Sequence, residues 1–187
     1  MTKRAVILMA DGFEEVEAIA PIDILRRAGI EVVLAGVNLQ NDHVQSTRQL
    51  SVRVDKPIEE LHFDFDACIV PGGGKGAENL AKSNHVHSLI SVMFAEKKVI
   101  AAICAAPAVV LAPTGILNNR TATCHPGMQN LFDPSTRYST EPVVVDDTLI
   151  TSQGPATALP FSYAIVERLL GKEPADKIRK ATLWSAS

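Results

Sequence analysis

One cysteine lies where a buried strand is expected to turn directly into a helix. Cys104 follows the apolar run 99–103 and precedes Ala105, Ala106 and a stretch that suits a helix. At such a junction free backbone N–H groups converge and the helix N-terminus favours negative charge, so a thiolate would be stabilised there. Cys104 is therefore a candidate nucleophile or redox centre. An unreactive core cysteine fits this segment equally well when it is taken alone.

A cluster of carboxylates follows the first apolar run of the chain. On a helix that begins near Glu14, the side chains of Glu14 and Glu17 share one face and Glu15 points elsewhere. Acidic residues in a first helical turn most often complement the helix dipole on a solvated face. A carboxyl turned inward against a cysteine would instead have a raised pKa, and its proton could be donated to the thiolate in a hydrogen bond.

Two more segments could complete a site. The glycine-rich run 71–76 follows an apolar strand, and its N–H groups could form an oxyanion hole beside Cys104 or only a structural turn. It lacks the ending of a P-loop and the spacing of a dinucleotide fingerprint. His125 could be a general base for Cys104, a substrate ligand or a structural histidine. Cys68 fits the core of an expected strand, whereas Cys124, next to His125, could be partly exposed.

Alternating strands and helices would position these residues. The pattern predicts strands at 4–10, 30–37, 67–70 and 98–103, and helices at 14–28, 77–82, 85–96 and 105–111. It then predicts a β-hairpin over 142–151, a helix over 155–170 that ends at Gly171, and a helix over 174–180. The fold class is α/β, an open sandwich with a mostly parallel sheet and helices on both faces. Beyond the carboxyl ends of the strands, 10–15, 71–74, 104–106 and the strand-like 121–123 with 124–126 would face one crevice.

Length and composition restrict the class of protein. With 187 residues, of which 47% are hydrophobic, the chain is expected to form one domain, 1–187. A formal net charge of −3, without a cluster of basic and aromatic residues, does not indicate nucleic-acid binding. No apolar run approaches the length of about twenty residues that a membrane span needs. Three cysteines without an export signal predict reduced thiols in the cytoplasm, and no spacing indicates a metal.

Several motifs in one order resemble the ThiJ/PfpI superfamily, and within it the subfamily of the Parkinson-disease protein DJ-1 and the bacterial protein YajL. They are Gly-Phe-Glu-Glu-Val-Glu, Pro-Gly-Gly-Gly-x-Gly-Ala, Ala-Ala-Ile-Cys-Ala-Ala-Pro and Thr-Ser-Gln-Gly-Pro-Ala-Thr. The resemblance implies a flavodoxin-like fold, a homodimer, no cofactor and a reactive Cys104 in a strained elbow. It also implies that Glu17 hydrogen-bonds this cysteine and that the N–H groups of Gly73 and Ala105 form the oxyanion site.

Other positions are carried over from the same resemblance. His125 matches a histidine near the pocket, and Arg48 matches an arginine close to the reactive thiol. Gln153 stands where the human protein has an arginine, which puts any anion-binding role of that position in doubt. PfpI-type peptidases carry a histidine directly after the nucleophile, and Ala105 stands there instead. Peptidase activity is therefore not expected.

The resemblance implies a stress-protective hydrolase of the deglycase or cofactor-independent glyoxalase type. Its substrates would be methylglyoxal, glyoxal or their early adducts on proteins. The alternative is a redox-sensing chaperone in which Cys104 is oxidised to a sulfinate, because an accessible thiol beside N–H donors suits oxidation as well.

Overall fold

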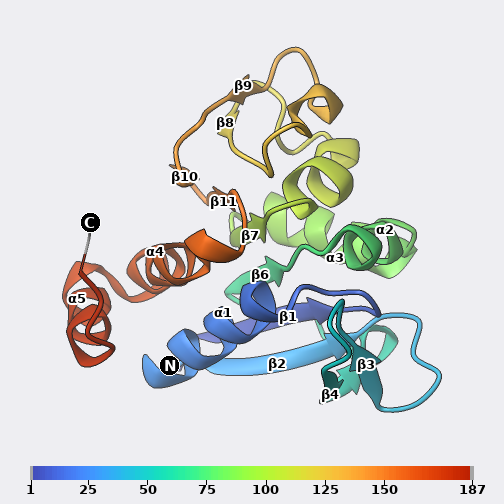
Figure 1. The fold of residues 1–187 in the computed structure, drawn as a ribbon, viewed down its shortest axis with the longest axis horizontal. Coiled ribbons are helices and arrows are strands. Elements are labelled where there is room, and N and C mark those ends of the chain that lie inside the picture. The colour runs from blue at the N-terminus through green and yellow to red at the C-terminus, as the bar shows by residue number, and fades with distance from the viewer. Residues whose placement is uncertain (1, 186–187) are drawn as a thin grey trace.

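The structure, a computed structural model that describes residues 2–185, contains a seven-stranded sheet between two layers of helices (Figure 1). The strand order is β10-β11-β7-β6-β1-β2-β5, and only the β10–β11 pair is antiparallel. The strands are β1 (Arg4–Met9), β2 (Glu31–Gly36), β5 (Lys56–Pro57), β6 (Ala67–Val70), β7 (Val99–Ile103), β10 (Val143–Asp146) and β11 (Leu149–Ser152). Sites at the carboxyl edge of β1, β6 and β7 therefore lie on adjacent strands at the centre of the sheet.

The helices divide into two layers because the strands are apolar on both faces. They are α1 (Glu15–Arg27), α2 (Gly74–Ala81), α3 (Asn84–Ala95), α4 (Ala158–Leu170) and α5 (Lys172–Ala181). In β1, Ala5, Ile7 and Met9 pack in the core with α1 and α4, whereas the intervening residues pack in a second core with α2 and α3. This two-sided burial explains the continuous apolar run that marks β1 in the sequence. No helix within residues 2–185 has the length and apolarity to cross a membrane.

Two small sheets lie outside the main one. The strands β3 (His43–Gln45) and β4 (Ser51–Arg53) form an antiparallel pair, and β8 (Thr121–Ala122) pairs in parallel with β9 (Arg137–Tyr138). The strand-like run 121–123 is thus not a strand of the main sheet. The motif 124–126 consequently reaches the carboxyl edge from a loop.

The expected α/β class, the order of its elements and the hairpin formed by β10 and β11 are confirmed. The helix expected over 105–111 is present in part, as a π-helical turn (Pro107–Leu111) that is followed by a 3-10 turn (Ala112–Thr114). Pro113 has no backbone N–H, so a regular helix cannot continue through it with its hydrogen bonds intact.

Candidate active site

Cys104 occupies a strained position immediately after the last residue of β7. Its φ of 64° lies in the left-handed region that side chains other than glycine rarely adopt. Two backbone hydrogen bonds hold it there: its N–H donates to the carbonyl of Ser152 at 2.9 Å, and its own carbonyl accepts from the N–H of His125 at 2.8 Å. The half-buried thiol is thereby turned out of the strand toward the carboxyl edge of the sheet.

Glu17 lies next to this thiol and is completely buried. It belongs to the first turn of α1, where the Glu14 side chain accepts from the N–H of Glu17 at 2.8 Å and so caps the helix. Its Oε2 atom accepts from the N–H of Gly72 at 2.9 Å. Burial raises the pKa of Glu17 to about 7, and the neighbouring Cys104 thiol opposes that rise. Glu17 is therefore the inward-facing carboxyl that the sequence allowed but did not require.

The thiol itself differs from the sequence expectation. Burial, and after it the Glu17 carboxylate, raise the pKa of Cys104 to about 12, although the N–H groups of Gly73 and Ala105 lower it. The backbone N–H groups favour the thiolate, but burial and an ionised Glu17 outweigh them. A protonated Glu17 carries no repelling charge and can donate a hydrogen bond, so carboxyl and thiol titrate as a pair.

The glycine-rich loop supplies N–H groups to the same place. Gly73 has a φ of 88° and precedes the first residue of α2. A Cβ at this position would lie 2.4 Å from the carbonyl oxygen of Gly12, so both the backbone conformation and the space require glycine. Through this loop the N–H of Gly73 reaches the sulfur of Cys104, as does the N–H of Ala105. Both are backbone donors of the kind that an oxyanion site uses.

The remaining predicted site residues are less closely tied to the thiol. The His125 backbone is bonded to Cys104, but its ring is exposed and its Nδ1 lies 3.0 Å from the carbonyl oxygen of Pro126. Arg48 is exposed on the turn between β3 and β4. Within residues 2–185, neither the His125 ring nor the Arg48 guanidinium hydrogen-bonds to Cys104 or Glu17.

Glu15 has a role that sequence reasoning missed. Its carboxylate accepts from the hydroxyl of Ser46 at 2.5 Å, from that of Thr47 at 2.9 Å and from the N–H of Arg48 at 2.5 Å. These bonds, led by that from Ser46, lower the pKa of Glu15 to about 2. The partners lie more than thirty positions away along the chain, so no local pattern could reveal that Glu15 fastens the β3–β4 turn to α1.

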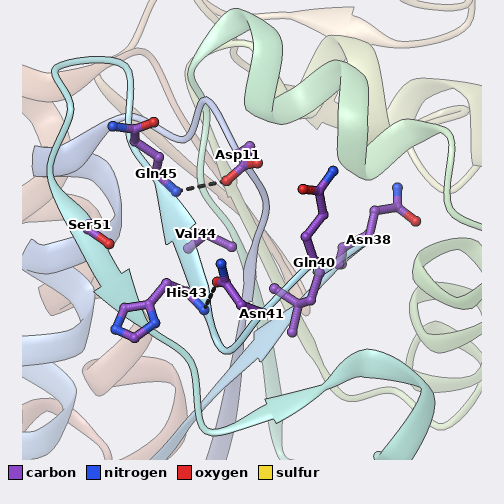
Figure 2. A pocket seen from close by; sticks show the side chains of 10 residues that line it. Asp11, Asn38, Gln40, Asn41, His43, Val44, Gln45 and Ser51 are labelled. Carbon is purple, nitrogen blue, oxygen red and sulfur yellow. Dashed lines mark hydrogen bonds between the residues drawn. The ribbon is translucent and has the colours of Figure 1, made fainter.

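A polar hollow lies beside the same small sheet (Figure 2). Its volume is about 290 Å³, and its lining comes from 37–41 and 43–45 together with Asp11 and Ser51. Inside it, the N–H of Gln45 donates to Oδ1 of Asp11 at 2.8 Å (Figure 2). None of the predicted site residues lines it, so this hollow is distinct from the Cys104 site.

A family model places the chain among known proteins. The model of the DJ-1/PfpI family matches residues 3–168. The chain belongs to the DJ-1/PfpI family. Within this family it falls in the subfamily of DJ-1 and the Parkinson disease protein 7 homologues, which confirms the resemblance read from its motifs.

Individual members of the DJ-1/PfpI family match over nearly the whole chain. The chain is 38% identical over 181 residues to the Parkinson disease protein 7 homolog of Danio rerio, with 95% of each protein covered. It is 30% identical over 184 residues to the glutathione-independent glyoxalase DJ-1 of Schizosaccharomyces pombe, with 94% of this chain and 95% of that protein covered. The structure of oxidized Toxoplasma gondii DJ-1 matches with a TM-score of 0.94 and 35% identity, covering 99% of this chain and 100% of that one.

The other two cysteines of this DJ-1/PfpI chain are separated from the site by burial. Cys68 and Cys124 are both fully buried, and burial raises their pKa values to about 12 and about 11. Cys68 is a core residue as expected, whereas partial exposure of Cys124 is not observed. Among residues 2–185, no three His, Cys, Asp or Glu side chains are grouped to hold a metal ion.

Proposed function

We propose that the protein is a cysteine-dependent, cofactor-independent glyoxalase and deglycase, which acts on methylglyoxal, glyoxal or their early adducts on protein side chains. The observation that carries this proposal is the pairing of a half-buried cysteine with a buried carboxyl whose pKa is raised to about 7. A carboxyl with that pKa can both accept and donate a proton at neutral pH, which isomerisation of a dicarbonyl requires. The Schizosaccharomyces pombe relative named as a glutathione-independent glyoxalase supports the same reaction class.

The first step is attack of Cys104 on the aldehyde carbon. Glu17 takes the thiol proton as the C–S bond forms, and the carbonyl π electrons move to the oxygen. The N–H groups of Gly73 and Ala105 donate to that developing oxyanion, which then receives the proton from Glu17. The product is a neutral hemithioacetal on Cys104.

The second step moves a hydrogen between the two carbons of the former dicarbonyl. Glu17 removes the proton from C1 and returns it to C2, while the hydroxyl proton moves from the oxygen on C1 to the oxygen on C2. C1 is thereby oxidised to a thioester and the carbonyl at C2 is reduced to an alcohol. No external oxidant or reductant is needed. Water then hydrolyses the thioester to lactate, or to glycolate from glyoxal, and regenerates the thiol. We propose that His125 positions the adduct and that Arg48 contributes to substrate binding.

Replacing the nucleophile tests this function. Cys104→Ala should abolish lactate formation from methylglyoxal, measured by NMR in a buffer without primary amines and after removal of trace metals. Cys68→Ala is the matched control and should retain the wild-type rate, since Cys68 is buried in β6. A Cys104→Ala protein that formed lactate at the wild-type rate would exclude the proposal.

A second candidate function is redox sensing by the same thiol. The oxidized state of the Toxoplasma gondii relative and the donors from Gly73 and Ala105 favour it, because these N–H groups could bind sulfinate oxygens. Graded peroxide followed by mass spectrometry should then convert Cys104 to the sulfinate before Cys68 or Cys124 reacts. Equal oxidation of all three cysteines would argue against a sensor.

We also propose that the protein is a cytoplasmic homodimer. Val16 and Ile19 of α1 and Leu159 of the neighbouring α4 are 49%, 38% and 42% exposed, and a second copy would cover them. Light scattering after gel filtration should give twice the monomer mass for the wild type and the monomer mass for Ile19→Glu. Leu183→Glu, at a residue that is 91% exposed, is the control and should remain a dimer. A wild-type monomer at micromolar concentration would refute this assembly.

A further inference from the structure

The two oxygens of the Glu17 carboxyl have different surroundings. Oε2 accepts the hydrogen bond from the N–H of Gly72 at 2.9 Å. Oε1 is buried and has no hydrogen-bond partner among residues 2–185. Cys104 nevertheless lies close enough to affect the pKa of the carboxyl. A backbone N–H can only donate, so the oxygen that it contacts must offer a lone pair. The carbonyl oxygen of a neutral carboxyl accepts better than its hydroxyl oxygen, which leaves Oε1 to carry the proton.

Gly72 also determines how closely the carboxyl and the cysteine approach. A Cβ at Gly72 would lie 2.4 Å from Oε2 of Glu17 and 2.7 Å from the Cβ of Cys104. Any side chain at position 72 would therefore overlap the Glu17 carboxyl and the Cys104 side chain. The φ of Gly72 is not left-handed, so the backbone alone would accept alanine. Glycine is required here by the two groups that meet against it.

We propose that Gly72 is the positioning residue of the Glu17–Cys104 pair: its N–H fixes Oε2 as an acceptor and directs the proton on Oε1 toward the sulfur, and its missing side chain lets the two groups meet. The pair with one proton exchanges between thiol with carboxylate and thiolate with carboxylic acid. Gly72 acts on this exchange through Glu17 and does not touch the substrate. The inference rests on the proposed use of this pair, but neither of its tests involves turnover of a carbonyl compound, so the two can fail separately.

The pH profile of Cys104 alkylation by iodoacetamide is the first test. In the wild type the rate constant should rise with an inflection near pH 7, where the pair loses its first proton, and then reach a plateau. In Gly72→Ala the displaced carboxyl no longer shares its proton, so the inflection should disappear, as it should in Glu17→Gln. Gly74→Ala is the matched control in the same loop, because a Cβ there meets no atom within 4 Å. It should keep the wild-type profile.

The second test uses no Gly72 variant, so it does not depend on whether such a variant folds. The infrared difference spectrum of the wild type between acidic and alkaline pH, with Glu17→Gln to assign the band, reports the C=O stretch of neutral Glu17. With the proton on Oε1, the carbonyl oxygen is Oε2, and its bond to the Gly72 N–H should lower the frequency relative to a free buried carboxylic acid. A band at the free frequency would overturn the proposal. A folded Gly72→Ala protein with the wild-type alkylation profile would overturn it as well.

Discussion

The raised pKa of Glu17 should make the stability of the fold depend on pH in a specific direction. Burial moves this pKa from an ordinary 4.5 to about 7, so the folded chain holds the proton more tightly than the unfolded chain. The contribution to stability is therefore complete below pH 4.5 and is lost as the pH rises through 7. Because a tenfold change in proton affinity corresponds to about 1.4 kcal/mol, the loss amounts to about 3 kcal/mol.

Glu17→Gln should remove this dependence. The amide is neutral at every pH, and its carbonyl can still accept from the N–H of Gly72. Wild type and variant should have similar free energies of unfolding near pH 4.5, and at alkaline pH the variant should be more stable by about 3 kcal/mol. The assay is urea-induced unfolding at closely spaced pH values under reducing conditions, followed by the fluorescence of Trp184.

An exposed carboxylate provides the control for this experiment. Glu78 of α2 lies 3.7 Å from Lys75, and its side chain is 57% exposed. Glu78→Gln should change the free energy of unfolding by less than about 1 kcal/mol at any pH, since exposed ion pairs contribute little. A free-energy difference between wild type and Glu17→Gln that is the same at pH 4.5 and at alkaline pH would show that Glu17 does not cause the pH dependence.

Three other predictions concern residues around the site. In the native protein at mildly alkaline pH, iodoacetamide should modify Cys104 alone, because Cys68 and Cys124 are fully buried; mass spectrometry of the digest would show label on either of them if this is wrong. Glu15→Gln should increase hydrogen exchange at the Arg48 amide, which loses a charged acceptor at 2.5 Å, and unchanged protection would show that Glu15 does not hold the β3–β4 turn. In the wild type, protection at that amide should persist near pH 4.5 and be lost as the pH falls toward 2, because the lowered pKa of Glu15 keeps it ionised until then.

The parts of the fold that follow from local pattern were predictable. The strands β1, β6 and β7 are buried on both faces, so they stand out as apolar runs. Adjacent parallel strands end at the same edge of a sheet. The α/β class was therefore enough to predict that Cys104 and the glycine-rich loop lie in the same region. The confirmed hairpin of β10 and β11 follows equally from alternating residues around a polar turn.

Features that depend on distant contacts were not predictable in the same way. The buried carboxyl of Glu17 accepts its hydrogen bond from Gly72, which lies 55 positions further along the chain. The effect of that carboxylate on Cys104 outweighs the local N–H groups that sequence reasoning had considered. His125 reaches the site through one backbone bond from a loop. Periodicity carries no information about contacts of this kind.

Covalent catalysis by Cys104 can be observed in a single turnover with carbon-13-labelled methylglyoxal. Samples are quenched in acid at successive times, and the peptide that contains Cys104 is analysed by mass spectrometry while lactate is followed by NMR. An acid-stable thioester on Cys104 should appear before lactate, decay as lactate accumulates, and form much more slowly in Glu17→Gln. Lactate that accumulates at the wild-type rate without label on Cys104 at any time would contradict covalent catalysis by Cys104.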